Sequence, residues 1–159
     1  MKRVILTIFV ALLSITIGFA KPVPINSFAD LMKALNSGKN VRVVIYYAKC
    51  QLISDNEIED KSPDAVGGMS ISTYEYFAQK AVRNDKAFVV TSETKLIANP
   101  KGKGYVYNYV KIKISEDNKV RIIAQYLDPK TYETLMDESL YTSINDGKND
   151  AGFFIYTDE

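Results

Sequence analysis

Carboxylates are the side chains best placed for acid–base chemistry in this chain, because the sequence contains no histidine and one cysteine. The lack of histidine excludes Ser-His-Asp and Cys-His nucleophilic sites and histidine-built zinc sites, and one cysteine excludes a cysteine-cluster metal site. Paired carboxyl groups, as in glycosidases, remain available for a small hydrolase. No spacing selects a pair, so we assign no catalytic residue; the candidates are Glu75, Glu93, Asp128, Glu133, Asp137 and Glu138.

Other catalytic and ligand-binding motifs are weak. Ser92 and Lys95 lie three residues apart on an expected strand, so they should point to opposite faces, which argues against a Ser–Lys dyad. Gly102-x-Gly104 lacks the third glycine and the following helix of a phosphate loop. The acidic segment Leu52–Val66 lacks the spacing and glycine of a calcium loop and indicates a polar surface loop. We therefore expect no metal site and no cofactor.

The tyrosines form the most patterned surface that the sequence predicts. In an extended strand, Tyr105, Tyr107 and Tyr109 would stand in a row on one face, followed there by Lys111 and Lys113. Such a row can stack sugars or anchor a protein partner, since each ring offers apolar area with a polar tip. It can equally be covered by a helix or an opposite sheet wall. These five residues are the binding candidates.

Cys50 is the only cysteine, so the chain has no intramolecular disulfide. A lone cysteine is most often a small buried apolar residue. In an exported chain it is also a candidate for a reactive thiol or an intermolecular disulfide.

The segment 105–127 predicts the elements that position these residues. Val106, Val110, Ile112 and Ile114 alternate with the tyrosines and lysines, and Asn108 is the one polar residue on their side. Such alternation is typical of a half-buried strand. A polar turn at 116–119 and a second alternating run, 120–127, complete a β-hairpin. Asp128-Pro129 then suits a type I turn that reverses the chain into a strand over 132–141.

The remaining elements follow from capping, alternation and turn residues. We expect an extended lead over 21–26, an amphipathic helix over 27–36, and strands over 41–50, 87–97 and 152–156. The segment 69–77 suits a strand, although a capped helix over 72–84 remains open. Gly67-Gly68 is interpreted as a strand entrance with unusual backbone angles. The predicted fold is α+β, mainly β: an antiparallel meander of six or seven strands, a curled sheet or partly closed barrel, with one N-terminal amphipathic helix.

The first twenty residues have the pattern of a secretory signal peptide. A basic start, Met1-Lys2-Arg3, precedes an apolar run over 4–19, and Gly18 and Ala20 suit the −3 and −1 positions of a cleavage site. The remaining residues, 21–159, would form a single domain without a transmembrane span. The full chain has 20 basic and 19 acidic residues. Loss of Lys2 and Arg3 would leave 18 basic residues, so the net charge of residues 21–159 would be near −1. That balance argues against a nucleic-acid partner.

Several phrases together resemble the VirK family of small exported bacterial proteins: SFADLMKALNSGKNVRVVIYYAKC, PDAVGGMSISTYEYF, AFVVTSETKLI, YVYNYVKIKISEDNKV and QYLDPKTYE. The likeness covers most of residues 27–133 and is one of segment order, not of a catalytic signature. It implies an exported protein, in some members linked to virulence and host interaction, with no established activity and no catalytic residues to carry over.

The sequence thus predicts an exported, periplasmic or secreted protein that is not an enzyme and binds a ligand or a protein partner. The alternatives are a small carboxylate-based hydrolase and an envelope carrier of an apolar ligand. Neither the partner nor the oligomeric state follows from the sequence.

Overall fold

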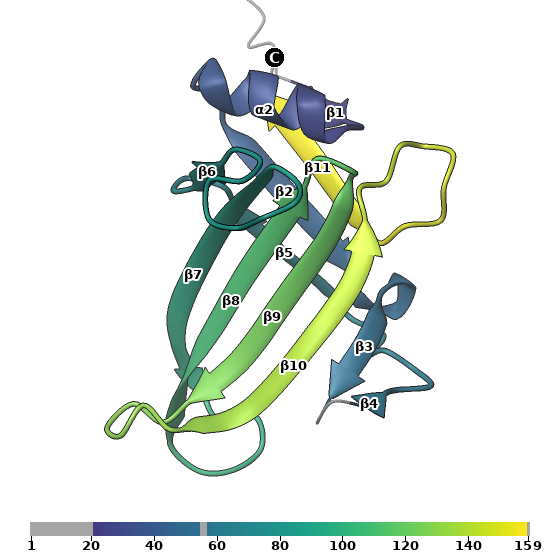
Figure 1. The fold of residues 1–159 in the computed structure, drawn as a ribbon. Helices are drawn as coiled ribbons and strands as arrows, with labels where there is room; N and C mark the ends of the chain where they lie inside the picture. Colours follow the sequence, from purple (N-terminus) through teal and green to yellow (C-terminus); the bar gives the residue numbers. More distant parts are fainter. Residues whose placement is uncertain (1–20, 55–56, 159) are drawn as a thin grey trace, which may run out of the picture.

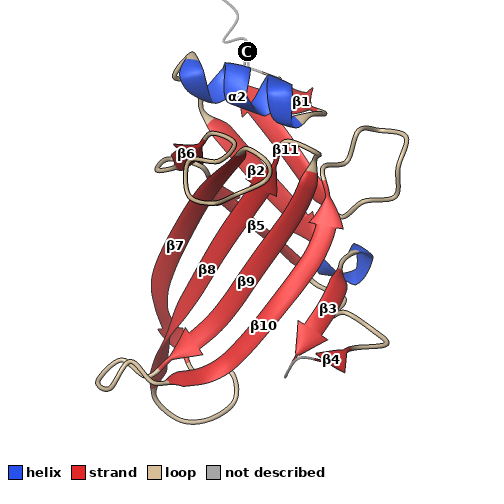
Figure 2. Cartoon of the chain, in the orientation of Figure 1, coloured by secondary structure: helices blue, strands red, loops and turns tan. Residues whose placement is uncertain are grey.

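The computed structural model describes residues 21–54 and 57–158, which form two antiparallel sheets facing each other (Figures 1 and 2). The smaller sheet contains, in spatial order, β1 (Pro22–Ile25), β11 (Phe153–Asp158), β2 (Val41–Tyr46) and β5 (Val66–Ser70). The larger sheet contains β4 (Glu57–Ile58), β3 (Gln51–Ser54), β10 (Thr134–Ser143), β9 (Lys119–Leu127), β8 (Tyr105–Ser115), β7 (Phe88–Ala98) and β6 (Glu75–Phe77).

The hydrophobic core lies between the two sheets. Val43 and Ile45 of β2 and Phe153 of β11 pack in one cluster with Ile112 of β8 and Ile122 of β9, and all five are at least 98% buried. Burying an isoleucine side chain contributes about 1.5–3 kcal/mol relative to leaving it exposed. The inward positions of both sheets therefore hold the molecule together.

Helix α2 (Phe28–Asn36) lies across one end of the two sheets (Figure 1). Its buried stripe includes Leu31 and Leu35, which join the same core cluster. The Ser27 hydroxyl accepts a hydrogen bond from the Asp30 amide at 3.1 Å, which caps the first turn. The Phe28 amide donates to Oδ1 of Asn118 at 2.7 Å, so the β8–β9 turn also binds the start of the helix.

The local predictions around the central hairpin are confirmed. Strand β8 spans the predicted residues, and β9 and β10 follow it after the expected turns. Helix α2 and its Ser27 cap match the helix expected over 27–36, and β7 matches the strand expected over 87–97. Strand β2 begins at Val41 as expected but ends at Tyr46, where the short 3₁₀ helix η1 (Tyr47–Lys49) follows. The chain is mainly β, with every paired strand antiparallel except for one isolated bridge.

The prediction of a single meander of six or seven strands is wrong. The strands form two sheets, and within the described residues neither closes into a barrel. Three strands were missed where composition looked irregular. Strand β1 contains two prolines, which an edge strand tolerates, and β3 and β4 fall almost entirely in the segment interpreted as a polar loop. The segment 69–77 is divided between β5 and β6, which belong to different sheets, and no helix forms over 72–84. The signal-peptide segment 1–20 lies outside the described residues.

Candidate functional site

The predicted binding residues lie together on the outer face of β8, which points away from the smaller sheet. Tyr105 is 64% exposed, Tyr107 and Tyr109 are half-buried, and Lys111 and Lys113 are exposed. The alternating residues of the same strand, such as Ile112, face the core. Tyr132 partly covers Tyr107, and residues 73–75 lie beside Tyr109, so the row is only partly open to solvent.

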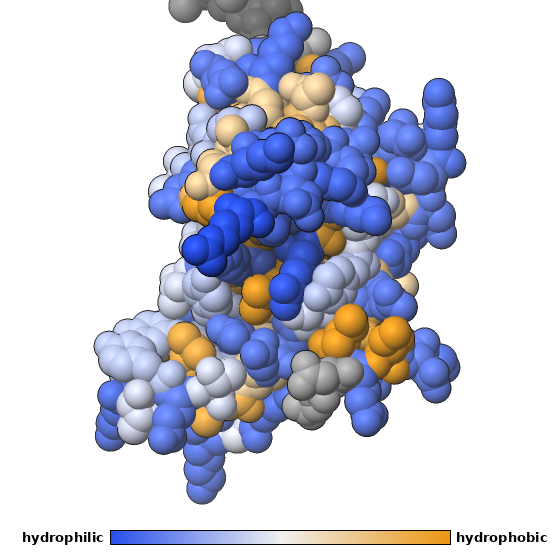
Figure 3. All heavy atoms as spheres, viewed as in Figure 1, coloured by the Kyte–Doolittle hydropathy of each residue, from blue (hydrophilic) through white to orange (hydrophobic). Residues whose placement is uncertain are grey.

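Neighbouring strands extend the aromatic end of this face. Leu96 of β7 and Leu127 of β9 lie on either side of Tyr107 in the sheet, and Leu96 is 55% exposed. Tyr132, in the β9–β10 connection, stacks on Tyr107 with ring centroids 6.3 Å apart. Figure 3 shows orange, apolar patches scattered among pale and blue side chains on the lower half of this view. We call Tyr105, Tyr107 and Tyr109, with Leu96 and Tyr132, the tyrosine face.

Beyond the tyrosine face, the other half of the outer surface of β8 and its neighbouring strands is basic. The ammonium group of Lys113 lies 4.1 Å from the centre of the Phe88 ring, and the guanidinium of Arg121, on the next strand, lies 5.5 Å from that of Tyr141. Between the two halves, Tyr109 and Lys111 line a hollow of about 220 Å³ together with Thr73, Tyr74, Glu75, Val90, Thr91 and Ser92. The face therefore combines apolar rings, a hollow and positive charge.

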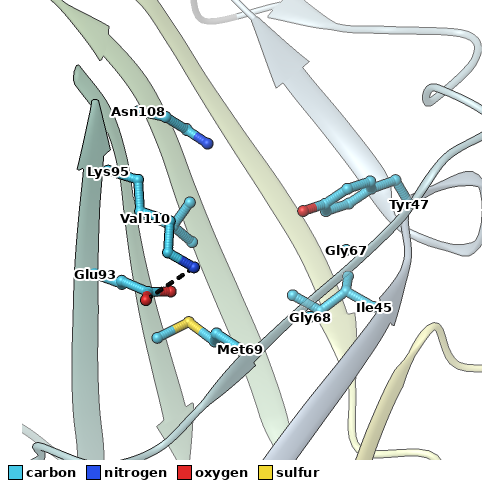
Figure 4. A pocket seen from close by; sticks show the side chains of 9 residues that line it. All are labelled: Ile45, Tyr47, Gly67, Gly68, Met69, Glu93, Lys95, Asn108 and Val110. Carbon is cyan, nitrogen blue, oxygen red and sulfur yellow. Dashed lines mark ion pairs between the residues drawn. The ribbon is translucent and has the colours of Figure 1, made fainter. Parts of the chain in front are cut away.

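A second candidate lies between the sheets, where a cleft opens beside β5 and β7 (Figure 4). Ile45, Met69 and Val110 form its apolar lining. Its polar groups come from Glu93, Lys95, Asn108 and Tyr47, and the Lys95 ammonium pairs with the Glu93 carboxylate at 3.0 Å. The larger sheet supplies three of these side chains, and Tyr47 of η1 points toward them from the other side of the gap.

Two glycines of β5 make this cleft possible. A Cβ atom on Gly67 would lie 2.2 Å from the Tyr47 hydroxyl, and one on Gly68 would lie 2.9 Å from the Val43 carbonyl oxygen. Neither glycine has a positive φ, so the expected unusual backbone angles are absent. The glycines are needed for close approach instead. Burial of the Tyr47 ring raises the pKa of its hydroxyl, with smaller contributions from Cys50 and Tyr126.

The candidate acid–base groups are dispersed. Glu75 and Glu93 each line a different hollow, and each of the three hollows described here contains a single carboxylate. Glu93 and Glu138 share one inward row of the larger sheet but stand three strands apart, or about 14 Å between backbones. Asp128 forms hydrogen bonds to amides of its own turn. Within the described ranges no three acidic or cysteine side chains cluster as metal ligands would.

The remaining candidates do not form a nucleophilic site in this geometry. Ser92 and Lys95 both line the hollow beside β7, but the Lys95 ammonium pairs with Glu93. Cys50 is 93% buried in the core, and burial raises the pKa of its thiol. Because the thiolate is the reactive form, both properties argue against a reactive cysteine.

Sequence reasoning missed the cleft, because its walls come from segments far apart in the chain. Its one local signal was Asn108, the polar residue on the apolar side of β8. Nothing near Tyr47 in the sequence indicated that its hydroxyl would reach the same space. In the part of the chain that the structure covers, no helix has the length and apolar character to cross a membrane.

Comparison with known proteins identifies relatives by sequence and by fold. A family model described as VirK protein matches residues 24–132. A similar fold occurs in the crystal structure of lpg1832, a VirK family protein from Legionella pneumophila, with a TM-score of 0.65 and 19% sequence identity. The alignment covers 84% of this chain and 98% of that chain. None of the curated proteins matches.

Proposed function

The chain belongs to the VirK family, and we propose that it is an exported, non-enzymatic binding protein that holds a protein partner on its tyrosine face. The observation that carries the proposal is the row of Tyr105, Tyr107 and Tyr109 on the outer face of β8, in which Tyr105 is 64% exposed and the other two rings are half-buried. Buried cores are the usual place for adjacent aromatic rings, and tyrosine is enriched where proteins bind one another. A row of rings that stays partly exposed at the surface therefore favours a partner that covers it.

The composition of the face indicates the chemistry of that partner. The aromatic half offers rings whose rotamers are already restrained, as for Tyr107 stacked on Tyr132. The basic half, with Lys111, Lys113 and Arg121, attracts acidic groups and would increase the association rate at low salt. A partner with an apolar anchor beside acidic side chains would complement both halves.

Export is part of the same proposal. Removal of residues 1–20 would leave β1 intact, because that strand begins at Pro22. A periplasmic or secreted location would let the face meet envelope or host proteins, as the virulence link of some family members suggests. Mass spectrometry of the exported protein should then give a chain that starts at Lys21, and an intact Met1 would contradict the proposal.

The alternative functions have less support from the geometry. A glycosidase-like hydrolase needs two carboxyl groups about 5–10 Å apart in one cleft, and the three hollows each contain one. A carrier of an apolar ligand needs a deep apolar pocket, whereas the cleft between the sheets contains an ion pair, an amide and a phenol.

The test is a quantitative pull-down from host or envelope extract with residues 21–159. The test variant replaces Tyr105, Tyr107 and Tyr109 by alanine, and the control replaces the exposed Tyr46 and Tyr76, which lie outside the face. Loss of three interface tyrosines should lower the affinity for a specific partner at least about tenfold. The control should bind as the wild type does.

Circular dichroism and urea unfolding should show that both variants remain folded. Equal recovery of every partner by the triple variant and the wild type would contradict a role of the tyrosine face. Repeating the binding at high salt distinguishes the contributions of the aromatic and basic halves to the affinity, since only the contribution of the basic half should weaken.

A further inference from the structure

We propose that the cleft between the two sheets is a second, independent site, which binds a neutral saccharide unit through Glu93, Lys95, Asn108 and Tyr47. The cleft consists of two neighbouring hollows, of about 170 and 430 Å³, that share Gly68, Met69, Glu93 and Lys95. It is open because β6 pairs only with the first residues of β7, Phe88–Val90. Beyond them, the β7 edge faces the unpaired edge of β5.

The inner face of the larger sheet changes from apolar to polar where the cleft begins. One cross-strand row places Thr91 beside Ile112 and Ile122, all buried. Two residues further along each strand, the next rows bring Glu93, and then Lys95, Asn108 and Tyr126, to the same face. A row that served only to fill the core would remain apolar.

Several of these polar groups are available to a ligand. The side chains of Asn108, Tyr126 and Tyr47 are half-buried, and none of their polar atoms is both fully buried and unpaired within the described residues. Half-buried groups of this kind normally bond to protein or to ordered solvent. Their convergence on one cleft, at the end of an apolar core, matches the composition of small-molecule sites.

Protection of a sheet edge explains only part of this pattern. Inward-pointing charges on an edge strand prevent edge-to-edge association, and Glu93 and Lys95 of β7 fit that role. Asn108 and Tyr126 lie on β8 and β9, which are paired on both sides. Edge protection gives no reason for polar side chains there, whereas a ligand does.

The polar groups select a ligand with several hydroxyls. The Glu93 carboxylate accepts hydrogen bonds and the Lys95 ammonium, 3.0 Å away, donates them. Two adjacent hydroxyls of a sugar can satisfy this pair, because one donates while its neighbour accepts. The Asn108 amide and the Tyr47 hydroxyl each offer a donor and an acceptor in addition.

Charge and apolar contact favour a neutral sugar over a charged ligand. The ion pair of Glu93 and Lys95 balances its own charge, and Arg42, which also lines the larger hollow, pairs with Asp158, so an anion or a cation would have to disrupt one of these pairs. Met69, Val110 and Ile45 offer apolar contact to the C–H face of a sugar ring. Gly67, which lies opposite the inward-facing Ile45, gives the β5 wall no side chain that would collide with Tyr47.

The experiment is a ¹H–¹⁵N NMR titration of residues 21–159 with glucose, galactose, mannose and N-acetylglucosamine. We expect at least one sugar to shift the amides of Gly67, Gly68, Met69 and Val110, with a Kd of about 1 mM or tighter. Glu93→Gln and Asn108→Leu should each weaken binding about tenfold or more, as loss of a hydrogen bond in such a site does. Glu75→Gln, in the hollow on the outer face, should leave the affinity unchanged.

Three results would overturn the proposal: no shift at these amides with any sugar, shifts produced by zwitterionic amino acids but not by sugars, or unchanged affinity in a folded Glu93→Gln variant. A dispersed spectrum establishes folding for each variant. The triple tyrosine variant of the outer face should bind the sugar as the wild type does, which separates this proposal from that of a protein partner.

Discussion

Gly152 shows how one missing side chain sets a packing contact. A Cβ atom there would lie 2.5 Å from the Tyr46 carbonyl oxygen, 3.0 Å from Cβ of Lys49 and 3.1 Å from Sγ of Cys50. The nearest of these is a backbone atom, so the strand itself would have to move. Gly152 also accepts the Tyr46 amide at 2.8 Å, which fixes the distance between the chains.

We therefore expect Gly152→Ala to lower the free energy of unfolding by about 1–3 kcal/mol, as overpacking does in other cores. Gly102→Ala is the matched control, because its Cβ would meet only the Asn99 side chain at 3.4 Å. That variant should remain within about 0.5 kcal/mol of the wild type. Urea unfolding measures both, and equal stability of the two variants would show that β11 has room to shift.

At the scale of elements, Asn118 joins three segments. Its Oδ1 accepts the Phe28 amide of α2 at 2.7 Å, and its carbonyl accepts the Ile144 amide at 2.9 Å. Its φ is +64°, a conformation that asparagine tolerates better than most residues. The β8–β9 turn thus orders the helix start and the segment after β10.

Substitutions at Asn118 should separate these contributions. Asn118→Gly keeps the positive φ and loses the hydrogen bond to the Phe28 amide, at a cost of about 1 kcal/mol. Asn118→Ala should cost about 1 kcal/mol more, because it also strains the backbone. Asn118→Asp retains the acceptor and adds a favourable charge at the helix start, so it should match the wild type. Urea unfolding measures the free energy of unfolding of the three variants. A glycine variant as stable as the wild type would contradict the proposed role of Asn118 in capping the helix.

The elements that could be predicted from the sequence are those whose signals lie within their own segment. Alternation and a four-residue turn define β8 and β9, and Ser27 with a regular apolar stripe defines α2. Strand β1 was missed because its pairing depends on β11, at the other end of the chain, while its own prolines suggest a loop. The division between β5 and β6 depends on which sheet each half joins, and alternation in one segment contains no such information.

The same reasoning applies to the two candidate sites. The tyrosine face lies on one strand, so its residues could be predicted from period-two alternation, although whether another layer covered them could not. The cleft needs β2, η1, β5, β7 and β8 together. Its shape depends on two glycines that admit a distant ring and a distant carbonyl oxygen.

The stability of the whole molecule should depend on pH through three turn aspartates. A hydrogen bond from Lys86 lowers the pKa of Asp117. Backbone amides of Thr131 and Lys130 lower the pKa of Asp128. The amides of Lys148 and Asn149 do the same for the pKa of Asp146. A carboxyl whose pKa is lower in the folded state stabilises the fold at pH values above its unfolded-state pKa, which is near 4. This contribution is lost as the pH falls through the folded-state pKa.

The free energy of unfolding should therefore decrease between about pH 5 and pH 2. The double variant Asp128→Asn, Asp146→Asn keeps an oxygen acceptor in each turn but removes two titrating charges. Its stability should approach that of the wild type as the pH is lowered. Urea unfolding at several pH values gives this difference, and a constant difference would contradict the role of these charges.

The position of β11 has a consequence for when the chain can fold. Strand β11 lies between β1 and β2 in the smaller sheet, so β1 has no sheet partner, and β2 has only β5, until residues 153–158 arrive. A nascent chain would hold an incomplete smaller sheet until residues 153–158 are made. Under the export proposed above, this delay would favour an unfolded polypeptide during translocation.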